Sequence, residues 1–333
     1  MSRGYNVAVV GVTGAVGEKM LRILEERSFP VRNLRVVASE RSEGRVLKFW
    51  GENLRVERLR SSSFRDVEIA LFSAGAELSK EFSPQAVKKG SVVVDNSSAF
   101  RMESGVPLVV PEVNPDALKI HQSIIANPNC STIQLVVAIN PLYQVTRIKR
   151  LVISTYQAVS GTGREAIEEL KSQIQQWLKG EEIKKEVYPR QIAFNLLPHI
   201  GGFLANGYTE EELKLVNETK KIMEDDRFGI TATCVRVPVF IGHSEAVTVE
   251  TEKELSVDQV KKILSRAPGV ILEDDLDALL YPLPLQAAGK DEVFVGRIRK
   301  DESTKNGINL WIVADNLRKG AALNTIQIAE LLI

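Results

Sequence analysis

The sequence contains two cysteines, which lie in very different surroundings. Cys130 lies in the stretch Asn127–Thr132, between an apolar run that predicts a strand and one that predicts a helix. A thiol at a helix N-terminus feels the positive end of the helix dipole, which lowers its pKa and favours the nucleophilic thiolate. Cys234 lies inside an apolar strand-like run and is expected to be a buried structural residue. Position alone leaves Cys130 open to two interpretations, a catalytic nucleophile or another inert buried thiol.

A nucleophilic thiol needs a partner that handles protons, and the chain has three histidines. His121 precedes the strand that leads to Cys130, and His199 lies in the stretch Leu-Pro-His-Ile-Gly-Gly. His243 lies in Gly-His-Ser-Glu at the end of a predicted strand, which makes it the best-placed candidate. The sequence does not show whether it meets the cysteine.

Three charged residues in the second half of the chain could bind an ionic substrate. Arg236 lies inside an apolar strand-like run, where a charge needs a partner or a ligand. Thr209 and Glu212 form a capping-box pattern that predicts a helix start, and Glu211 and Lys214 share a face of that helix. Spacing alone favours an ordinary surface ion pair for Glu211 and Lys214.

A glycine-rich turn follows the first predicted strand, Tyr5–Val10, and precedes a helical pattern. Strand, turn and helix in this order are the context of a dinucleotide-binding fingerprint, in which backbone N–H groups approach a pyrophosphate. The glycines Gly11, Gly14 and Gly17 have the spacing GxxGxxG, which departs from the usual GxGxxG. The alternative is a tight strand–helix turn without a ligand.

The next predicted strand, Leu34–Ala38, ends in polar residues where a dinucleotide ribose would lie. Arg41, flanked by Ser39 and Ser42, offers donors that suit the 2′-phosphate of NADP, although Glu40 complicates this preference. The sequence therefore favours NADP, with an ordinary polar loop as the alternative. A cysteine beside a dinucleotide site suggests thioester formation and hydride transfer, in which a carbon passes between the acyl and aldehyde oxidation levels.

Strands and helices alternate in the first half of the chain, which predicts an α/β Rossmann-type N-terminal domain. Val67–Phe72 and Val92–Asp95 predict strands, and Ser79–Lys89 predicts a helix. Arg101, just after one of these strand ends, is the cation expected near the ligand edge, or else a surface arginine.

After about residue 140 the pattern predicts an α+β catalytic and dimerisation domain with a mixed, largely antiparallel sheet. Its predicted strands are Leu151–Tyr156, Ile230–Val239, Ala246–Glu250, Glu292–Lys300 and Gly307–Val313, with a helix through Ile167–Leu178. A last helix, 321–332, is expected to return to the first domain. The expected division is 1–128 with 315–333 for dinucleotide binding, and 129–314 for catalysis and dimerisation.

Composition narrows the class of protein. The chain has 333 residues, a length that favours two domains over one. The numbers of basic and acidic residues are equal, so nucleic acid and anionic membrane are not expected as partners. No run of about 18 apolar residues predicts a membrane span. The N-terminal residues lack the features of a signal peptide, and two cysteines are no disulfide framework. The expectation is a cytoplasmic protein with reduced thiols and no metal site.

Several stretches, taken in order along the chain, resemble the aspartate-semialdehyde dehydrogenase family. They are Thr13–Gly17, Ala38–Ser42, Asn127–Thr132, Thr155–Gly161, Glu211–Lys214, Arg236–Pro238, Gly242–Ser244 and Asp315–Ala322. The resemblance implies NADPH-dependent reductive dephosphorylation of L-aspartyl 4-phosphate to L-aspartate 4-semialdehyde. It also implies a role in lysine, threonine, methionine and diaminopimelate biosynthesis, and a homodimer joined through the second domain.

The resemblance also implies residue roles. Cys130 would form the thioester, His243 would be the general acid/base and Gln157 would orient the acyl group. Substrate and phosphate would be bound by Arg101, Asn129, Gln157, Glu211, Lys214 and Arg236, with Arg236 on the α-carboxylate and Glu211 on the amino group. NADP would be held by Gly11, Thr13, Gly14, Ala15, Val16, Ser39, Arg41, Ser42, Ser160, Gly161 and Asn316.

Three alternatives stay open. An N-acetyl-gamma-glutamyl-phosphate reductase would share the cysteine, the histidine and the fold, but its acylated substrate has no ammonium for Glu211 to bind. A cysteine hydrolase or amide transferase would need no nucleotide, so the Gly11–Gly17 turn argues against it. A non-catalytic NADP sensor would tolerate the loss of Cys130.

Overall fold

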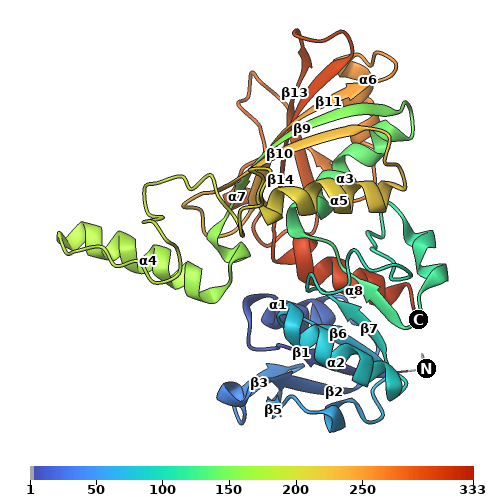
Figure 1. The fold of residues 1–333 in the computed structure, drawn as a ribbon, viewed down its shortest axis with the longest axis vertical. Coiled ribbons are helices and arrows are strands. Elements are labelled where there is room, and N and C mark those ends of the chain that lie inside the picture. Colours follow the sequence, from blue (N-terminus) through green and yellow to red (C-terminus); the bar gives the residue numbers. More distant parts are fainter. Residues whose placement is uncertain (1–3) are drawn as a thin grey trace. The chain divides into compact units, whose positions relative to one another are not determined.

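The structure is a computed structural model that describes residues 4–333 and divides into two compact units (Figure 1). Unit 1 contains the described residues up to Asn129 together with Ala321–Ile333, and unit 2 is Cys130–Gly320. Residues 1–3, which begin the segment where no signal peptide is expected, lie outside the described part. No helix within residues 4–333 combines the length and the apolar character that crossing a membrane requires.

Unit 1 is built on a parallel sheet with the strand order β5-β2-β1-β6-β7-β8. The strands are β1 (Tyr5–Val10), β2 (Val31–Ala38), β5 (Glu57–Arg58), β6 (Ile69–Phe72), β7 (Val92–Asp95) and β8 (Ile124–Ala126). Between β2 and β5 along the chain, β3 (Val46–Phe49) and β4 (Glu52–Arg55) form a separate small hairpin. A parallel sheet of apolar strands covered on both faces is the architecture of a Rossmann-type fold, which confirms the predicted class.

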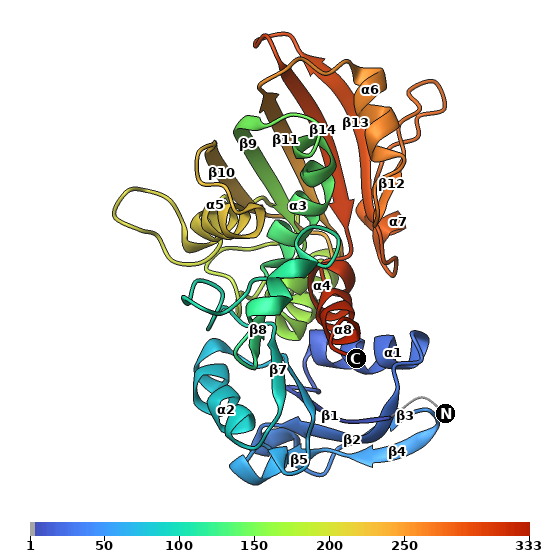
Figure 2. The ribbon, with the colours of Figure 1, turned by 90° about the vertical axis from the view of Figure 1, so that its right-hand side faces the viewer.

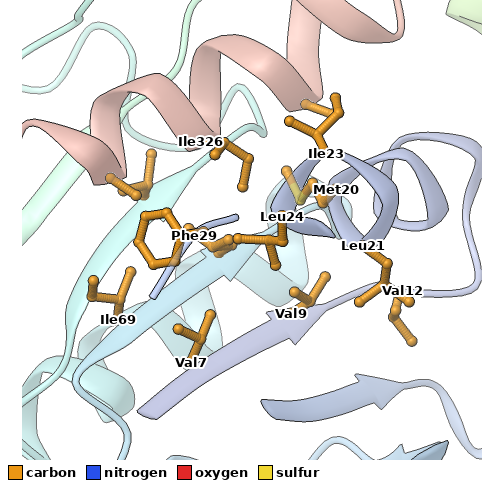
Figure 3. Close-up of a cluster of buried hydrophobic side chains, with 14 of the residues drawn as sticks. Val7, Val9, Val12, Met20, Leu21, Ile23, Leu24, Phe29, Ile69 and Ile326 are labelled. Carbon is orange, nitrogen blue, oxygen red and sulfur yellow. The ribbon is translucent and has the colours of Figure 1, made fainter. Parts of the chain in front are cut away.

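Alternate residues of β1 serve the two faces of this sheet. Val7 and Val9 pack with α1 (Ala15–Glu26) and α8 (Leu323–Glu330), as Figure 3 shows, whereas Ala8 and Val10 belong to a cluster that includes side chains of α2 (Ala76–Lys88). This follows from the two-residue period of a strand, because each face needs its own apolar set. Both layers of helices therefore hold β1 and its following turn in place.

Unit 2 is built on a mixed sheet with the order β10-β9-β11-β14-β13-β12. The strands are β9 (Ile148–Gln157), β10 (Gly229–Arg236), β11 (His243–Thr251), β12 (Val270–Leu272), β13 (Val293–Asp301) and β14 (Gly307–Ala314). The central pairs β9–β11, β11–β14 and β14–β13 are antiparallel, and the edge pairs β10–β9 and β12–β13 are parallel. The prediction of a mixed, largely antiparallel sheet is confirmed.

One face of this sheet is covered by helices, among them α3 (Cys130–Tyr143) and α5 (Glu210–Met223), which lie against the strands in Figure 2. The remaining helices of unit 2 are α4 (Arg164–Lys179), α6 (Val257–Leu264) and the short α7 (Pro284–Ala287). Within unit 2, α4 projects away from the sheet (Figure 1). The capping box predicted at Thr209 is confirmed at the start of α5.

Several element boundaries differ from the expectation by a few residues, and two of these differences concern the ends of β10 and of the last helix. Strand β10 ends at Arg236 and does not continue to Val239, because Pro238 has no N–H to offer the ladder. The last helix, expected over 321–332, is α8 (Leu323–Glu330) preceded by a π-helical turn at Arg318–Ala322. At the start of this turn, the bond from Gly320 N–H to Asp315 O also has the five-residue span of a π-helix.

Candidate active site

The turn after β1 needs glycine at two positions for steric reasons. Gly11 has φ +80°, and a Cβ there would lie 2.3 Å from the Ser73 carbonyl oxygen. A Cβ on Gly17 would lie 2.3 Å from the Gly11 carbonyl oxygen. Gly14 is the N-cap of α1 and supplies no side-chain cap, so the first N–H groups of the helix are suited to an anion. The predicted residues Thr13, Ala15 and Val16 lie in this turn and the first residues of α1.

A second turn, Glu40–Ser42, follows β2 and is tied to the glycine turn. The Thr13 and Ser42 hydroxyls lie 3.1 Å apart. The Glu40 carboxylate is 2.6 Å from the Arg58 guanidinium, so Glu40 is already paired, while Ser39 and Arg41 are exposed. Unit 1 thus brings together the predicted residues of both turns at the carboxyl ends of β1 and β2, where ligands bind in parallel sheets.

Arg101 is buried and braced by backbone oxygens. Its Nε donates to Asn127 O at 2.9 Å, and its Nη2 donates to Asn96 O at 3.0 Å. Asp95, which the sequence reasoning did not single out, anchors the same segment: it accepts from Ser97, and burial raises its pKa. The sequence feature that could have identified Asp95 is an acidic residue at the end of a predicted buried strand. The predicted residue Asn129 is also nearly fully buried, at the end of this part of unit 1.

Cys130 is the first residue of α3, as the pattern around it predicts. The backbone of Gly320 comes so close that a Cβ there would lie 2.9 Å from the Cys130 Cβ. The next residue, Ser131, accepts a hydrogen bond from Gln157 Nε2 at 2.9 Å. The start of α3 is therefore attached to the last residue of β9.

His243, the first residue of β11, is fully buried and its ring is oriented by the backbone. Ala158 N–H donates to His243 Nδ1 at 3.0 Å, so the neutral ring carries its proton on Nε2. Among residues 4–333, Nε2 has no hydrogen-bond partner. Burial, together with the nearby Arg236 charge, holds the pKa of His243 well below its usual range, which keeps the ring neutral. A Cβ on Gly161 would lie 3.0 Å from Nε2, so this turn passes directly beside the ring.

The other two histidines lie in different settings. In unit 1, His121 Nδ1 accepts from Ser123 N–H at 3.1 Å. In unit 2, His199 stacks on Phe203 with the ring centres 4.5 Å apart. Of the two histidines in unit 2, His243 is the one that the structure brings beside Arg236 and the Gly161 turn.

Arg236, Gln157 and His243 lie side by side at the ends of neighbouring strands. Arg236 of β10 is paired with Gln157 of β9, and the β9–β11 register places His243 next to Gln157. We call these three residues the first polar row. Arg236 Nη1 donates to Ala158 O at 2.7 Å, and its buried Nε has no partner within residues 4–333. The row faces α3, which bears the cysteine.

Glu211 joins this row from α5. Its carboxylate accepts from Gln157 Nε2 at 3.4 Å and from Lys214 Nζ at 3.2 Å. Glu211 is buried whereas about a third (34%) of the Lys214 side chain is exposed. The ion pair that spacing favours is present, but the prediction that it lies at the surface is wrong for Glu211, whose carboxylate also contacts the buried row.

Ser160 and Asn316, predicted to hold the cofactor, are buried and bonded to each other. Asn316 Nδ2 donates to Ser160 Oγ at 2.9 Å, and Asn316 Oδ1 accepts from Gly242 N–H at 2.9 Å. These bonds brace the two turns that flank His243. In the structure, Ser160 and Asn316 thus stabilise the backbone near His243.

Comparison with known proteins identifies the family. Residues 6–121 match "Semialdehyde dehydrogenase, NAD binding domain", and residues 139–319 match "Semialdehyde dehydrogenase, dimerisation domain". Proteins named aspartate-semialdehyde dehydrogenase from Aquifex aeolicus and Bacillus subtilis are 56% and 52% identical over 99% of this chain and 98% of their own.

Solved structures agree. The crystal structure of aspartate semialdehyde dehydrogenase II from Vibrio cholerae, complexed with ASA, has a TM-score of 0.97 and 50% identity, covering 99% of this chain and 98% of its own. The Pseudomonas aeruginosa structure, of a probable aspartate-semialdehyde dehydrogenase, has a TM-score of 0.93 at 34% identity. Unit 1 therefore contains a domain for a nicotinamide dinucleotide, and the chain belongs to the aspartate-semialdehyde dehydrogenase family.

Proposed function

We propose that this protein reduces L-aspartyl 4-phosphate with NADPH to L-aspartate 4-semialdehyde and phosphate, through a thioester on Cys130. The observation that carries the proposal is the first polar row, which faces the helix that begins at Cys130. It is supported by relatives that are named aspartate-semialdehyde dehydrogenase. By this proposal the enzyme serves lysine, threonine, methionine and diaminopimelate biosynthesis in the cytoplasm.

Cys130 is the nucleophile of the proposed reaction. Its thiolate attacks the acyl carbon, so that a C–S bond forms and the C–O bond to phosphate breaks. When bound, the reduced nicotinamide supplies the hydride that the acyl carbon needs to reach the aldehyde level. The C–S bond then breaks and returns the thiolate to Cys130. The proton consumed overall ends on the departing phosphate.

His243 acts on the carbonyl oxygen through Nε2. The neutral ring donates its Nε2 proton as a hydrogen bond, which stabilises the negative charge that develops when sulfur or hydride adds to the carbon. General acid/base catalysis at Nε2, which the family resemblance implies, would require Nδ1 to carry a proton. The Ala158 N–H that points at Nδ1 opposes this, so the donor role has the stronger support.

The charges in unit 2 match the ends of an aspartyl group. Arg236 binds the α-carboxylate with its guanidinium, and Glu211 binds the ammonium. Gln157, bonded to Ser131, orients the acyl group. Lys214 binds the phosphate, and from unit 1 we assign the same role to Arg101, with Asn129 as a further substrate contact. An N-acetylated substrate would leave the buried Glu211 without its cation.

The cofactor is NADP in this proposal. The turn Gly11–Gly17, with Thr13, Gly14, Ala15 and Val16, holds the pyrophosphate, and Ser39, Arg41 and Ser42 hold the 2′-phosphate. The pairing of Glu40 with Arg58 supports this preference, because it partly neutralises the acidic group that would repel a phosphate. From unit 2, Ser160, Gly161 and Asn316 contribute the remaining contacts.

The partner is a second copy of the chain, joined through unit 2. The match to a dimerisation domain over residues 139–319 supports this. So do the large apolar side chains that α4 and the segment after it leave exposed, namely Trp177, Leu178, Phe194, Leu196 and Phe203. Light scattering on the purified protein gives the mass that tests it.

The activity test runs in the oxidative direction. Purified protein with aspartate semialdehyde, phosphate and NADP is expected to reduce the nicotinamide, and its absorbance reports the rate. Parallel samples omit phosphate, replace NADP by NAD, or replace the substrate by N-acetylglutamate semialdehyde. A rate that needs no phosphate, or that appears only with the acetylated substrate, contradicts the proposal.

A further inference from the structure

A second polar row lies beneath the first one. It is formed by Cys234 of β10, Thr155 of β9 and Glu245 of β11, which are neighbours in the strand register and lie two residues from the members of the first row. Because side chains alternate along a strand, the two rows share a face of the sheet. Gln134 of α3 lies four residues, about one helical turn, after Cys130. The proposed mechanism uses no member of the second row and does not use Gln134.

Glu245 is a carboxyl group without an ionic partner in the interior of unit 2. It is fully buried, as are Thr155 and Gln134, and within residues 4–333 neither its oxygens nor the Gln134 amide atoms have a partner at hydrogen-bond geometry. Burial raises the pKa of Glu245 well above its usual range, and the nearby Gln134 amide only partly opposes this. Because a fully buried carboxylate without a cationic partner is strongly disfavoured, we expect this group to hold its proton at neutral pH.

The groups around the second row do not change this conclusion. From β10, Cys234 is an un-ionised thiol, because burial raises its pKa strongly. From α5, the negative charges of Glu211 and Glu212 act on the same cysteine and also raise its pKa. From β14 the neighbour in register is Ile312. Gln134 remains the polar group that faces the carboxyl from α3.

We propose that Glu245 is a positioning residue that ties α3 to β11 through reciprocal hydrogen bonds with Gln134. A carboxylic acid and a primary amide each offer one donor and one acceptor in the same plane, so the two groups can satisfy each other with a small side-chain adjustment. This inference rests on the proposed function, because α3 begins at the nucleophile Cys130 and β11 begins at the donor His243.

On both α3 and β11, the residue of the proposed contact lies close in sequence to a proposed catalytic residue. Cys130 and Gln134 are one turn apart on α3, and His243 and Glu245 are two residues apart on β11. A fixed contact between Gln134 and Glu245 therefore limits how far the sulfur and Nε2 can move relative to each other. Because misplacing reacting groups by about 1 Å can cost about 100-fold in rate, such a contact is expected to act mainly on kcat.

The test compares Glu245→Gln with Glu245→Leu. Glutamine keeps one donor and one acceptor, so kcat is expected to stay within about threefold, whereas leucine removes both and is expected to lower kcat by about 10- to 100-fold. The KM values are expected to change little, and the rate of Cys130 alkylation by iodoacetamide should change with kcat. Gln134→Leu should match Glu245→Leu, and the double variant should be no worse than either. Val247→Ala, the next position on this face of β11, is the control for lost packing alone.

A second measurement does not depend on activity. At neutral pH, the infrared difference spectrum between the parent and Glu245→Gln should contain the carbonyl stretch of a protonated carboxyl, and this holds even where the leucine variant does not fold. Parental kcat and alkylation rate in Glu245→Leu overturn the proposal. So does a Glu245→Gln variant as slow as the leucine variant, or a missing infrared band. If the parent lacks phosphate-dependent activity, the proposed function fails, while alkylation and the infrared band still test the contact.

Discussion

The two units present their functional groups in different ways. In unit 1 the candidate ligand site is made largely of backbone: a turn at the end of a buried parallel strand, where glycines let main chain approach main chain. In unit 2 it is made of side chains, with charged and polar residues arranged in rows on one face of a mixed sheet. A backbone site is sensitive to added atoms, whereas a side-chain site is sensitive to the exchange of one functional group for another.

Replacing the nucleophile should have the largest effect, because it should abolish turnover and leave cofactor binding nearly unchanged. Cys130→Ala is expected to lower kcat by more than about 10⁴-fold, because no other group can form the thioester. NADPH affinity, measured by fluorescence titration, should stay within about threefold, since Cys130 is not among the proposed cofactor contacts. Appreciable turnover in this variant would end the thioester mechanism.

The next largest effect is expected from a change that conserves charge. Arg236→Lys should lower kcat/KM for aspartate semialdehyde by about 10²-fold, because an ammonium cannot reproduce a bidentate guanidinium in a buried row. Steady-state kinetics measure it, with cofactor affinity as the control. A near-parental kcat/KM would show that Arg236 does not anchor the carboxylate.

In unit 1 the addition of a single methyl group should lower the stability of the fold. Gly17→Ala places a Cβ 2.3 Å from the Gly11 carbonyl oxygen, and neither backbone segment can yield easily. We expect the free energy of unfolding to fall by about 2–4 kcal/mol and cofactor affinity to weaken with it. Gly14→Ala, where the same oxygen would be 3.3 Å away, is the milder control in urea titrations.

The same methyl group in unit 2 should reduce activity more than stability. In Gly161→Ala the new Cβ lies 2.8 Å from Arg236 Nη1 and 3.0 Å from His243 Nε2, which are the ends of side chains. These ends can shift more easily than backbone, so kcat/KM is expected to fall about 10- to 100-fold while the free energy of unfolding falls by about 1 kcal/mol, less than in Gly17→Ala. Equal losses of stability in the two glycine variants would erase the contrast between the units.

The smallest effect is a pH dependence that belongs to unit 2. Because the pKa of His243 is lowered in the folded protein, the unfolded chain binds more protons as the pH falls below about 6.5, and stability is lost in that direction. Between pH 7 and pH 5.5 the parent should lose about 1 kcal/mol of unfolding free energy that His243→Gln does not lose. Urea titrations at both pH values measure the difference, and parallel curves for the two proteins would contradict a buried neutral ring.

Much of this molecule could be predicted locally. The strand–turn–helix at Gly11–Gly17, the start of α3 at Cys130 and the capping box at Thr209 depend on neighbouring residues, and the structure contains all three. The significance of Asp95 and of Glu245 was harder to see. Each depends on burial and on hydrogen-bonding groups from other elements, which no local pattern contains.

The sequence by itself determined the class of each unit, because the periodicity of apolar residues decides which faces of strands and helices are buried. It also determined which residues had the chemistry of a nucleophile, a proton donor and a carboxylate binder. Only the tertiary structure decided which of them meet. Strand register placed Arg236, Gln157 and His243 in one row, and the Ala158 N–H selected the tautomer of the ring. Register and burial arise from contacts between residues far apart in the chain, so they exist only once the sheet has formed.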